Sequence, residues 1–518
     1  MVRDIAARCA AVLRAIASLE ADIALRFPQV EEGAAAVTRA LRARLGGPAD
    51  LTVRELRHTS GRGVALLYLA PLVDEGLVQQ SCLAPLAQVL GQEAVPTVAR
   101  LHVAILPNGH VAELWSTDAL VQALLAGSAI LAVDGEPAAL AIDVASPPHR
   151  AVGEPKTESV VRGPRDGFTE DLRVNLGLVR LRLRSDTLRV ERFDLGYVSH
   201  TDVLMLHLEG IAAPDLVTEA RQRLSQIDLD AVLETGYIEE LIDDNPLSVF
   251  PSAWSTERPD RVTAGLLSGY VAILVEGTPF VLMVPGQMAN VMQSPEDYYV
   301  RYPQAVVMRA VRWLALLITS TLPATYVAIT TFHQELLPPP LFLSFAAARQ
   351  GVPIPVWLEA VLMESAFELL REAGVRMPRT VGQTVSVVGV LVIGQAAVAA
   401  KIVSPIMIVI VGTTAISSFA IPNLEFADAV RMLRFPAILA AAVFGLYGLV
   451  LGVLFVAVGL LDRTSFGQPF VSRGFFSTDA QRWKDVWWRA PWWLMHRRPA
   501  WAAAGTHRRQ PSGQSPPA

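Results

Sequence analysis

The sequence predicts a chain in two parts: an α/β N-terminal part made of two related lobes, and an all-α polytopic transmembrane bundle. Three observations support this prediction. Charged residues concentrate before Arg312 and in the final tail of the 518-residue chain, and the region between them is nearly free of charge. That region holds several uncharged runs long enough to cross a membrane. The region before it alternates helix and strand signals and contains an internal repeat.

Uncharged runs define the predicted bundle. The four expected spans are residues 313–332, 380–400, 402–424 and 435–461. A hydrocarbon core about 30 Å thick needs a helix of about 20 residues, and each run has that length. The alternative is a set of buried core helices in a soluble protein, but runs this long and this close together are rare there. We therefore expect a transmembrane domain over residues 301–480.

An internal repeat predicts that the two lobes are related. The stretch LLAGSAILAVDGEPAALAI at residues 124–142 aligns without a gap with LLSGYVAILVEGTPFVLMV at 266–284. Upstream, VALLYLAPL at 64–72 resembles VLMLHLEGI at 203–211 at a similar offset. An acid followed by Gly between two apolar runs is typical of a hairpin, because Gly adopts positive φ. Chance similarity is the alternative. The double match favours duplication, with lobes at 1–148 and 149–300.

Within the first lobe, a helix is expected over residues 1–45, where acids interrupt the apolar positions and argue against a secretory signal. Strands are predicted at 64–73 and 99–106, with a helix at 77–90 between them. Residues 146–175 are rich in Pro, Gly and charges of both signs, which is typical of a solvated linker. Residues 178–195 then alternate apolar and basic side chains, which predicts a strand with one face in water.

The segment at residues 338–372 interrupts the pattern of spans. It holds three consecutive prolines, a short apolar run and an amphipathic helix, so we expect it to be re-entrant or interfacial. Four crossings then place both termini on one side. The tail at 481–518 agrees, because its Trp, Lys and Arg residues favour the headgroup layer of a cytoplasmic leaflet. We therefore expect cytoplasmic lobes and a cytoplasmic tail, with disorder in the last residues.

Composition and motifs argue against several classes of function. The formal net charge of −5 argues against nucleic-acid binding. The two cysteines, Cys9 and Cys82, form no metal-binding pattern. The sequence lacks a P-loop, an H-E-x-x-H zinc motif and a G-x-S-x-G nucleophile elbow. We therefore expect no enzymatic activity, no catalytic residues, no metal site and no cofactor.

Polar and small residues near the spans are the candidate functional residues. Glu359, Glu364 and Glu368 lie on the amphipathic helix and are candidates to line or gate a pore. Alternatively, Glu364 and Glu368 form a solvated stripe that is paired internally with Arg371. Gln395 lies in the second span, where it either lines a pore with Val392 and Ala396 or bonds a neighbouring helix. The expected helix-packing residues, whose small side chains let backbones approach closely, are Gly389, Gly394, Ala400, Gly448 and Gly452.

Longer motifs resemble those of a known family. RGPRDGFTEDLRVNLGLVRLRLR at 162–184 and FPSAWSTERPDRVTAGLLSGYVAILVEGTPFVLMVP at 250–285 are similar to the signature of GerA-type spore germination proteins, the A subunits of nutrient germinant receptors. EDYYVRYPQAVVMRAVRW, LPATYVAITTFHQELLPP and SFGQPF follow in family order. The resemblance runs from about residue 60 to about residue 475. Lys401 departs from it, because the family pattern has Gly after the paired alanines.

The resemblance implies an integral protein of the inner membrane of the bacterial endospore, acting with a transporter-like B subunit and a lipoprotein C subunit. It further implies a homo-oligomeric ring, expected to be a pentamer, that forms a nutrient-gated cation channel. The implied partners are these subunits and membrane lipids, with no nucleic acid. Two alternatives stay open: an accessory stage V germination channel or amplifier subunit, and a non-conducting receptor scaffold. A secondary transporter is disfavoured, because the repeat lies outside the membrane part.

Overall fold

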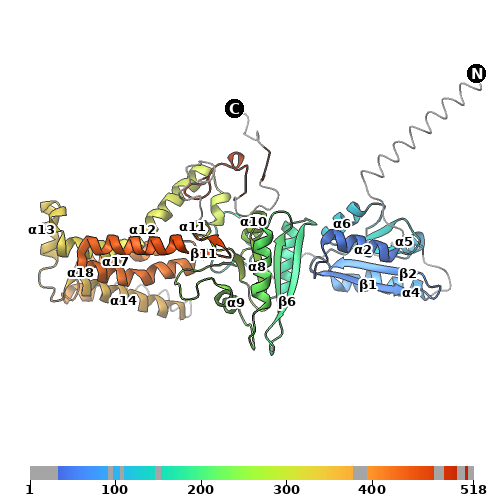
Figure 1. Ribbon diagram of the computed structural model, residues 1–518, viewed down its shortest axis with the longest axis horizontal. Helices are drawn as coiled ribbons and strands as arrows, with labels where there is room; N and C mark the ends of the chain where they lie inside the picture. The colour runs from blue at the N-terminus through green and yellow to red at the C-terminus, as the bar shows by residue number, and fades with distance from the viewer. Residues whose placement is uncertain are drawn as a thin grey trace, which may run out of the picture.

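Three parts follow one another along the long axis of the protein: a first lobe, a second lobe and a helix bundle (Figure 1). The computed structural model describes residues 33–91, 97–105, 110–145, 153–376, 394–471, 484–498 and 508–511. Most of the helix predicted over 1–45 and most of the span predicted over 380–400 lie outside these residues.

Lobe 1 is a five-stranded antiparallel sheet covered by helices on both faces. The strand order is β1-β2-β4-β5-β3, with β1 (Leu51–Arg57), β2 (Gly63–Leu69), β3 (Val111–Leu114), β4 (Ser128–Val133) and β5 (Ala139–Asp143). One face carries α2 (Ala34–Leu45) and α6 (Thr117–Leu125); the other carries η2 (Val78–Leu83), α4 (Ala84–Leu90) and α5 (Val98–Ile105), with α3 (Glu75–Leu77) leading into η2. The strand predicted at 99–106 is therefore wrong, because a short apolar run fits either period and here Leu101 packs from a helix.

Lobe 2 repeats this architecture. Its order is β6-β7-β9-β10-β8, with β6 (Leu188–Leu195), β7 (Thr201–Leu208), β8 (Trp254–Thr256), β9 (Val271–Val275) and β10 (Val281–Val284). One face carries α7 (Leu172–Arg182) and α10 (Pro259–Leu267); the other carries α8 (Pro214–Ser225) and α9 (Thr235–Ile242). The first half of the strand predicted at 178–195 is instead the end of α7. The arginines there do not mark a face in water, because Arg180 is itself buried in an ion pair.

The predicted repeat falls on equivalent elements of the two lobes, the helix, hairpin and strands from α6 to β5 and from α10 to β10. Gly135 and Gly277, which turn the two hairpins, have φ of 75° and 87°. The acid before each glycine also plays the same part. Asp134 accepts a hydrogen bond from the N–H of Ala34, the first residue of α2, at 2.8 Å. Glu276 accepts one from Leu172, the first residue of α7, at 3.1 Å.

A buried ion pair joins the two lobes. Arg180 on α7 donates to Asp50 from Nε at 2.5 Å and from Nη2 at 2.8 Å, and both side chains are almost fully buried. Beside it, the N–H of Ala49 donates to the carbonyl of Val190 on the edge strand β6 at 3.2 Å. Gly177 on α7 approaches Pro71 so closely that an added Cβ would lie 2.7 Å from its carbonyl oxygen. The lobes are thus held by charge, backbone and close packing together.

The third part is built mainly of helices. Its elements are α12 (Tyr302–Phe332), η5 (Gln334–Leu336), α13 (Pro339–Ala348), α14 (Val356–Arg376), α16 (Gly394–Ala399), α17 (Pro405–Ser418), α18 (Leu424–Asp462) and the short hairpin β11 (Thr464–Ser465) and β12 (Gln468–Pro469). Two short helices, α11 (Met288–Met292) and η4 (Pro295–Tyr298), lead into it, and η7 (Trp492–Leu494) follows it. Among the described residues, α12 and α18 are long and apolar enough to cross a membrane, which suggests membrane association.

The long helix α18 reverses direction at Gly445, where φ is 59° and ψ is −142°. Phe426 and Leu460, near its two ends, contact the same core of lobe 2, whereas a straight helix would separate them by about 50 Å. At the turn, an added Cβ on Gly448 would lie 2.2 Å from the carbonyl oxygen of Ala440. Residues 435–461 therefore do not form one straight crossing, because glycine permits a turn within an otherwise continuous apolar run.

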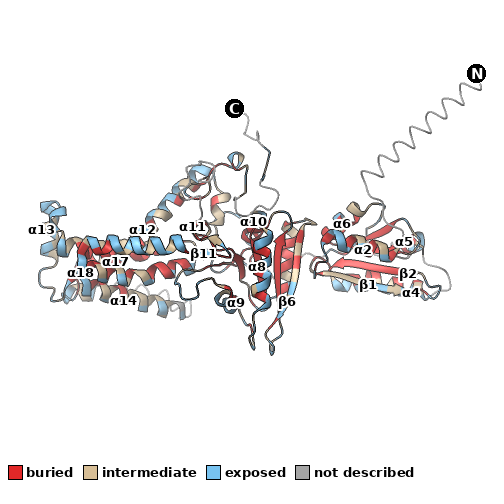
Figure 2. Ribbon diagram, in the orientation of Figure 1, coloured by how far each residue is buried: buried red, intermediate tan, exposed pale blue. Residues whose placement is uncertain are grey.

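The helix α14 packs along α12, α17 and α18 as a member of the bundle. Its Glu359 and Glu364 are buried, although the segment 338–372 was expected to be re-entrant or interfacial. Away from the bundle's interior the helices expose apolar side chains. The exposed residues are drawn pale blue along the ribbons of the bundle in Figure 2. The helix α17 has 14 residues, about 21 Å, which is shorter than the predicted span at 402–424.

Part of the C-terminal tail packs on the junction between lobe 2 and α12. Trp487 lies 4.8 Å from Trp313 between ring centroids, and Trp493 lies 5.8 Å from Tyr302. The tail was expected to meet lipid headgroups through its tryptophans. At least these two contact protein, because Tyr and Trp side chains at the start of α12 offer matching aromatic surface.

Candidate functional site

A polar ladder runs along the helix bundle, with one acid of α14 at each step. The first step is Glu359, whose Oε1 accepts hydrogen bonds from the N–H and the hydroxyl of Ser404, both at 2.6 Å. Ser404 caps the start of α17, and Arg349 Nη2 lies 3.7 Å from the other carboxylate oxygen. Because Glu359 is fully buried, this step ties α14 to the first turn of α17.

The second step pairs Glu364 with Arg434 of α18, and both side chains are 1% exposed. Arg434 Nε also donates to the carbonyl of Thr319 in the middle of α12, at 3.0 Å. Three helices therefore meet at one guanidinium. A charged pair inside a bundle costs desolvation energy, so it persists only with such additional hydrogen bonds. The arrangement fixes the relative positions of α12, α14 and α18.

The third step is a wider cluster nearer lobe 2. Glu368 accepts from Arg371 at 2.9 Å and lies 3.4 Å from Arg431 of α18, which also pairs with Asp428. Arg371 reaches Asp428 at 3.4 Å. Two acids and two bases thus alternate between α14 and α18. Within the stripe considered from the sequence, only Glu368 has a partly exposed pairing of this kind, because Glu364 is buried. Glu359 is buried as well.

A second network closes the junction between lobe 2, α12 and the tail. Asp297 is fully buried and accepts from Arg309 at 3.2 Å and from Arg312 at 2.7 and 2.8 Å. Arg309 also donates to Asp485 of the tail at 3.1 Å, and the hydroxyl of Tyr298 donates to Asp485 at 2.8 and 2.9 Å. Burial raises the pKa of the Asp485 carboxyl, against the opposing effect of Arg309. In the sequence, Arg309 and Arg312 are basic residues just before the predicted span at 313–332. The sequence does not reveal Asp297, which pairs with both, or Asp485, which pairs with Arg309.

The segment between the lobes belongs to a third network. Arg258 is fully buried and donates to the carbonyls of Glu158 at 3.1 Å and Pro164 at 2.9 Å. It also forms a bidentate pair with Asp260 at 3.1 and 2.9 Å, and Asp260 accepts from the hydroxyl of Tyr299 at 2.5 Å. The described part of the predicted solvated linker is thus held against lobe 2. The prolines and charges of this segment are typical of a solvated linker, but its backbone carbonyls accept hydrogen bonds from the buried Arg258.

An acidic group marks the contact between α9 and the start of α18. Burial raises the pKa of the Glu239 carboxyl to about 8, with further contributions from Glu425, Asp243 and Glu234. Glu425, on the first turn of α18, accepts from the hydroxyl of Ser255 at 2.9 Å. Like charges held close together favour protonation of one member. Lobe 2 and α18 therefore meet across a titratable contact.

The other candidate residues occupy different environments. Gln395, Ala396 and Ala400 are exposed on or just after α16, and Gly394 is buried there. Gly448 packs at the turn of α18, whereas Gly452 faces open space. Val392 and Gly389 lie outside the described residues. The structure thus separates Gln395, on an outer surface, from the three glutamates, which lie inside the bundle. Where the structure is described, no group of three or more His, Cys, Asp or Glu could hold a metal ion.

Comparison with known proteins identifies the family. The family model described as Bacillus/Clostridium GerA spore germination protein matches residues 39–501. The chain belongs to the GerA family. Its relatives include spore germination protein KA of Bacillus subtilis (strain 168), 42% identical over 91% of this chain and 87% of that protein. Spore germination protein GerLA of Bacillus cereus is 38% identical over 89% of this chain and 94% of that protein.

The chain is also similar to a membrane protein and to a solved domain. The uncharacterized membrane protein YfkQ of Bacillus subtilis (strain 168) is 40% identical over 91% of both chains. Among solved structures, the N-terminal domain of the A subunit of the Bacillus megaterium spore germinant receptor GerK3 is 29% identical. It covers 50% of this chain and 96% of that one, with a TM-score of 0.40. Membership of the GerA family confirms the resemblance found in the sequence motifs.

Proposed function

We propose that this GerA-family protein is the A subunit of a spore germinant receptor, that it oligomerises as a ring, and that the ring is a nutrient-gated ion channel. Its proposed partners are the receptor B and C subunits, further copies of itself and membrane lipids. Its proposed location is the inner membrane of the endospore, with both lobes and the tail in the cytoplasm. No catalytic step, metal or cofactor forms part of this proposal.

The exposed polar surface around α16 supports a pore. Gln395 is exposed on the subunit surface together with the small residues Ala396 and Ala400. Elsewhere the bundle exposes large apolar side chains, such as Val450 and Phe455, which are 63% and 81% exposed. An amide facing hydrocarbon would remain without hydrogen bonds at a cost of several kcal/mol. A ring of subunits that turns α16 inward would give each copy of Gln395 water.

The polar ladder of Glu359, Glu364 and Glu368 has a different proposed role. Each carboxylate has a hydrogen-bond or ion-pair partner within its own subunit, so we assign the three acids to gating rather than to the pore wall. A tilt of α14 would have to break the Glu364–Arg434 pair, and breaking a buried pair costs about 3–5 kcal/mol. The ladder would then hold the closed state until nutrient binding to a partner subunit supplies that energy.

The membrane orientation has a direct test. Residues 337–351, around α13, lie at the end of the bundle farthest from the lobes (Figure 1). In a background without Cys9 and Cys82, an impermeant thiol reagent outside the membrane should label cysteines placed at 337–351 and should miss cysteines placed after Arg489. Labelling of the tail from outside would contradict the cytoplasmic placement of the lobes.

Ion flux through liposomes containing the purified protein tests the channel. Val392→Ala should widen a closed constriction and increase leak, and Gln395→Leu should change it, whereas Ala396→Leu should obstruct packing or conduction. Val450→Ala is the matched control, because Val450 is exposed on the apolar surface of α18 and should leave flux unchanged. Equal flux from the parent, Val392→Ala and Gln395→Leu, at equal assembly, would contradict the assignment of this segment. No flux from any assembled form would favour the receptor scaffold.

A further inference from the structure

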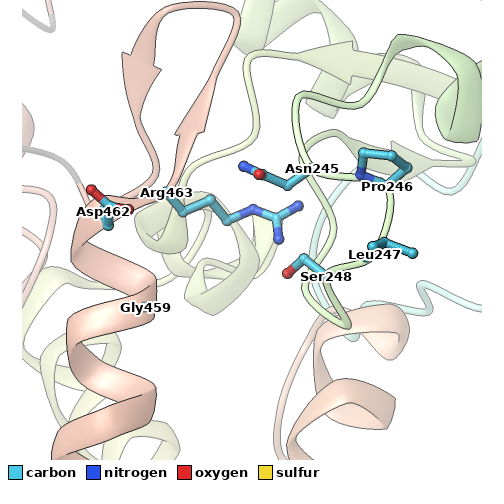
Figure 3. A pocket seen from close by; sticks show the side chains of 7 residues that line it. All are labelled: Asn245, Pro246, Leu247, Ser248, Gly459, Asp462 and Arg463. Atoms are coloured by element: carbon cyan, nitrogen blue, oxygen red, sulfur yellow. The ribbon is translucent and has the colours of Figure 1, made fainter.

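A pocket of about 430 Å³ lies where the last turn of α18 meets the loop after α9 (Figure 3). Its walls are Asn245, Pro246, Leu247 and Ser248 from the loop, and Gly459, Asp462 and Arg463 from the end of α18. None of these residues belongs to the polar ladder or the α16 surface. The pocket lies at the boundary between the long apolar helix α18 and the polar lobe 2.

The floor of the pocket is an incompletely paired arginine. Arg463 is 5% exposed, and its Nη2 donates to Asp243 at 3.2 Å. Its Nε and Nη1 are buried and have no hydrogen-bond partner. Figure 3 shows the side chain extending from α18 toward Asn245 and Ser248. Buried N–H groups of a guanidinium are costly to leave unpaired, and they match phosphate oxygens in geometry.

The other walls supply an acid and an apolar edge. Asp462 lines the pocket beside Arg463 in the chain, and Asp243 forms an ion pair with the guanidinium. An anion alone would therefore meet two nearby carboxylates. Leu247 is 99% exposed and forms an apolar edge of the pocket. An added Cβ on Gly459 would meet nothing within 4 Å, so the helix side of the pocket is open.

We propose that this pocket binds the headgroup of a zwitterionic phospholipid that carries a primary ammonium group. The phosphate accepts hydrogen bonds from Arg463 Nε and Nη1, and the ammonium lies beside Asp462. The acyl chains pass Leu247 and continue along the apolar surface of α18. Both charges of the headgroup thus find an opposite charge, which a purely anionic lipid does not achieve.

The inference shares with the proposed function the placement of α18 in a membrane, but it does not require conduction or a ring. The full chain is purified in detergent and titrated with phosphatidylethanolamine or with phosphatidylglycerol in mixed micelles. Native mass spectrometry counts bound lipid, and the shift in unfolding temperature reports its effect. Glycerophosphoethanolamine, which lacks acyl chains, separates lipid binding from binding of a free headgroup.

Two glycines on one face of α18 provide a matched pair of variants. Gly459→Val fills the pocket, whereas Gly452→Val adds the same side chain two turns earlier on the same face, also into open space. We expect phosphatidylethanolamine to bind the parent and Gly452→Val at least fivefold more tightly than phosphatidylglycerol. Gly459→Val should lose that preference. Glycerophosphoethanolamine should bind the parent at least tenfold more weakly than the intact lipid.

Equal binding of the two lipids to the parent, or an undiminished preference in Gly459→Val, would overturn the proposal. Equal binding of glycerophosphoethanolamine and the lipid would also overturn it, because it would mark a free-headgroup site. If Gly459→Val does not fold, Asp462→Asn replaces it and should abolish the preference for the ammonium headgroup. Retained preference in Asp462→Asn would reject the assignment of the ammonium. A protein that conducts no ions yet shows the preference would reject only the proposed channel.

Discussion

The two lobes share a strand order but use equivalent positions differently. Asp118 in α6 and Asp260 in α10 occupy the same place in the repeat. The Asp118 side chain is 50% exposed and lies 3.7 Å from Arg44, whereas Asp260 is buried between Arg258 and Tyr299. Ser116 caps α6 in lobe 1, where lobe 2 has Arg258 before α10. The strand order is thus the same in both lobes, but only the helix start that faces the bundle has a buried ion pair at this position.

What surrounds each lobe accounts for this difference. The core of lobe 2 on the α7 and α10 side continues into the bundle through Phe426, Ala427 and Val430 of α18 and Phe470 beyond it. A lobe that must hold a helix bundle in one orientation benefits from directional polar contacts, which apolar packing alone does not supply. Lobe 1, at the far end of the molecule, meets lobe 2 through the Asp50–Arg180 pair.

The largest expected loss of stability is at the residues that precede the equivalent helices α6 and α10. Arg258→Ala should destabilise the protein by about 3–5 kcal/mol, because it leaves Asp260 buried without its partner. Ser116→Ala, at the matching position in lobe 1, should cost about 1 kcal/mol through the lost cap. Denaturant unfolding of the two variants of the full chain measures both values. Equal losses would show that the two helix starts do not differ in energy.

The contact between the lobes comes next. Asp50→Ala should leave the buried Arg180 unpaired and cost about 3 kcal/mol, with increased proteolysis between the lobes. Arg173→Ala removes a second interlobe pair, with Glu75, whose side chains are 75% and 65% exposed, and it should cost less than about 1 kcal/mol. Limited proteolysis and thermal unfolding of both variants provide the comparison. A larger effect of Arg173→Ala would mean that the buried pair does not hold the lobes together.

A smaller loss of stability is expected at the two acids that have the same role in both lobes. Asp134→Ala and Glu276→Ala each remove the acceptor for the first N–H of α2 or α7, and each should cost about 1 kcal/mol. Asp134 also accepts from the N–H of Gly63 at 2.8 Å, so its loss should be slightly larger. Hydrogen exchange at the first turns of α2 and α7 reads out each loss locally. Protection that falls at one helix only would break the functional equivalence of the two acids.

The last prediction concerns the pH dependence of stability at the titratable contact of lobe 2. Because the pKa of Glu239 is raised to about 8 in the folded state, the folded protein holds a proton that the unfolded chain has already lost. Stability should therefore fall as pH rises from about 4.5 to about 8, and the loss should be complete above that range. Glu239→Gln should remove this component of the pH dependence, whereas the lobe 1 control Glu113→Gln should leave it intact. Unfolding temperatures measured across this pH range provide the test.

The sequence was most informative where a pattern is local and repeated. The two hairpins, each with an acid before a glycine, predicted two related α/β lobes, and two of the uncharged runs fall within α12 and α18. The reversal at Gly445 was missed, because glycine lies within many apolar helices. The positive φ of Gly445 and the close approach of Gly448 to Ala440 are visible only in the structure. The buried acids of α14 were found as candidates, but their partners were not, since Arg434 lies 70 residues from Glu364.

The tail contact also has a consequence for the order in which the protein is assembled. Arg309 and Asp485 are 176 residues apart in the chain. During synthesis the start of α12 therefore leaves the ribosome long before the acid that completes its charge pairing. Until then, Asp297 alone must balance Arg309 and Arg312. A chain that stops before residue 485 would contain both lobes and every described helix of the bundle, yet the junction between lobe 2 and α12 would carry an unbalanced positive charge.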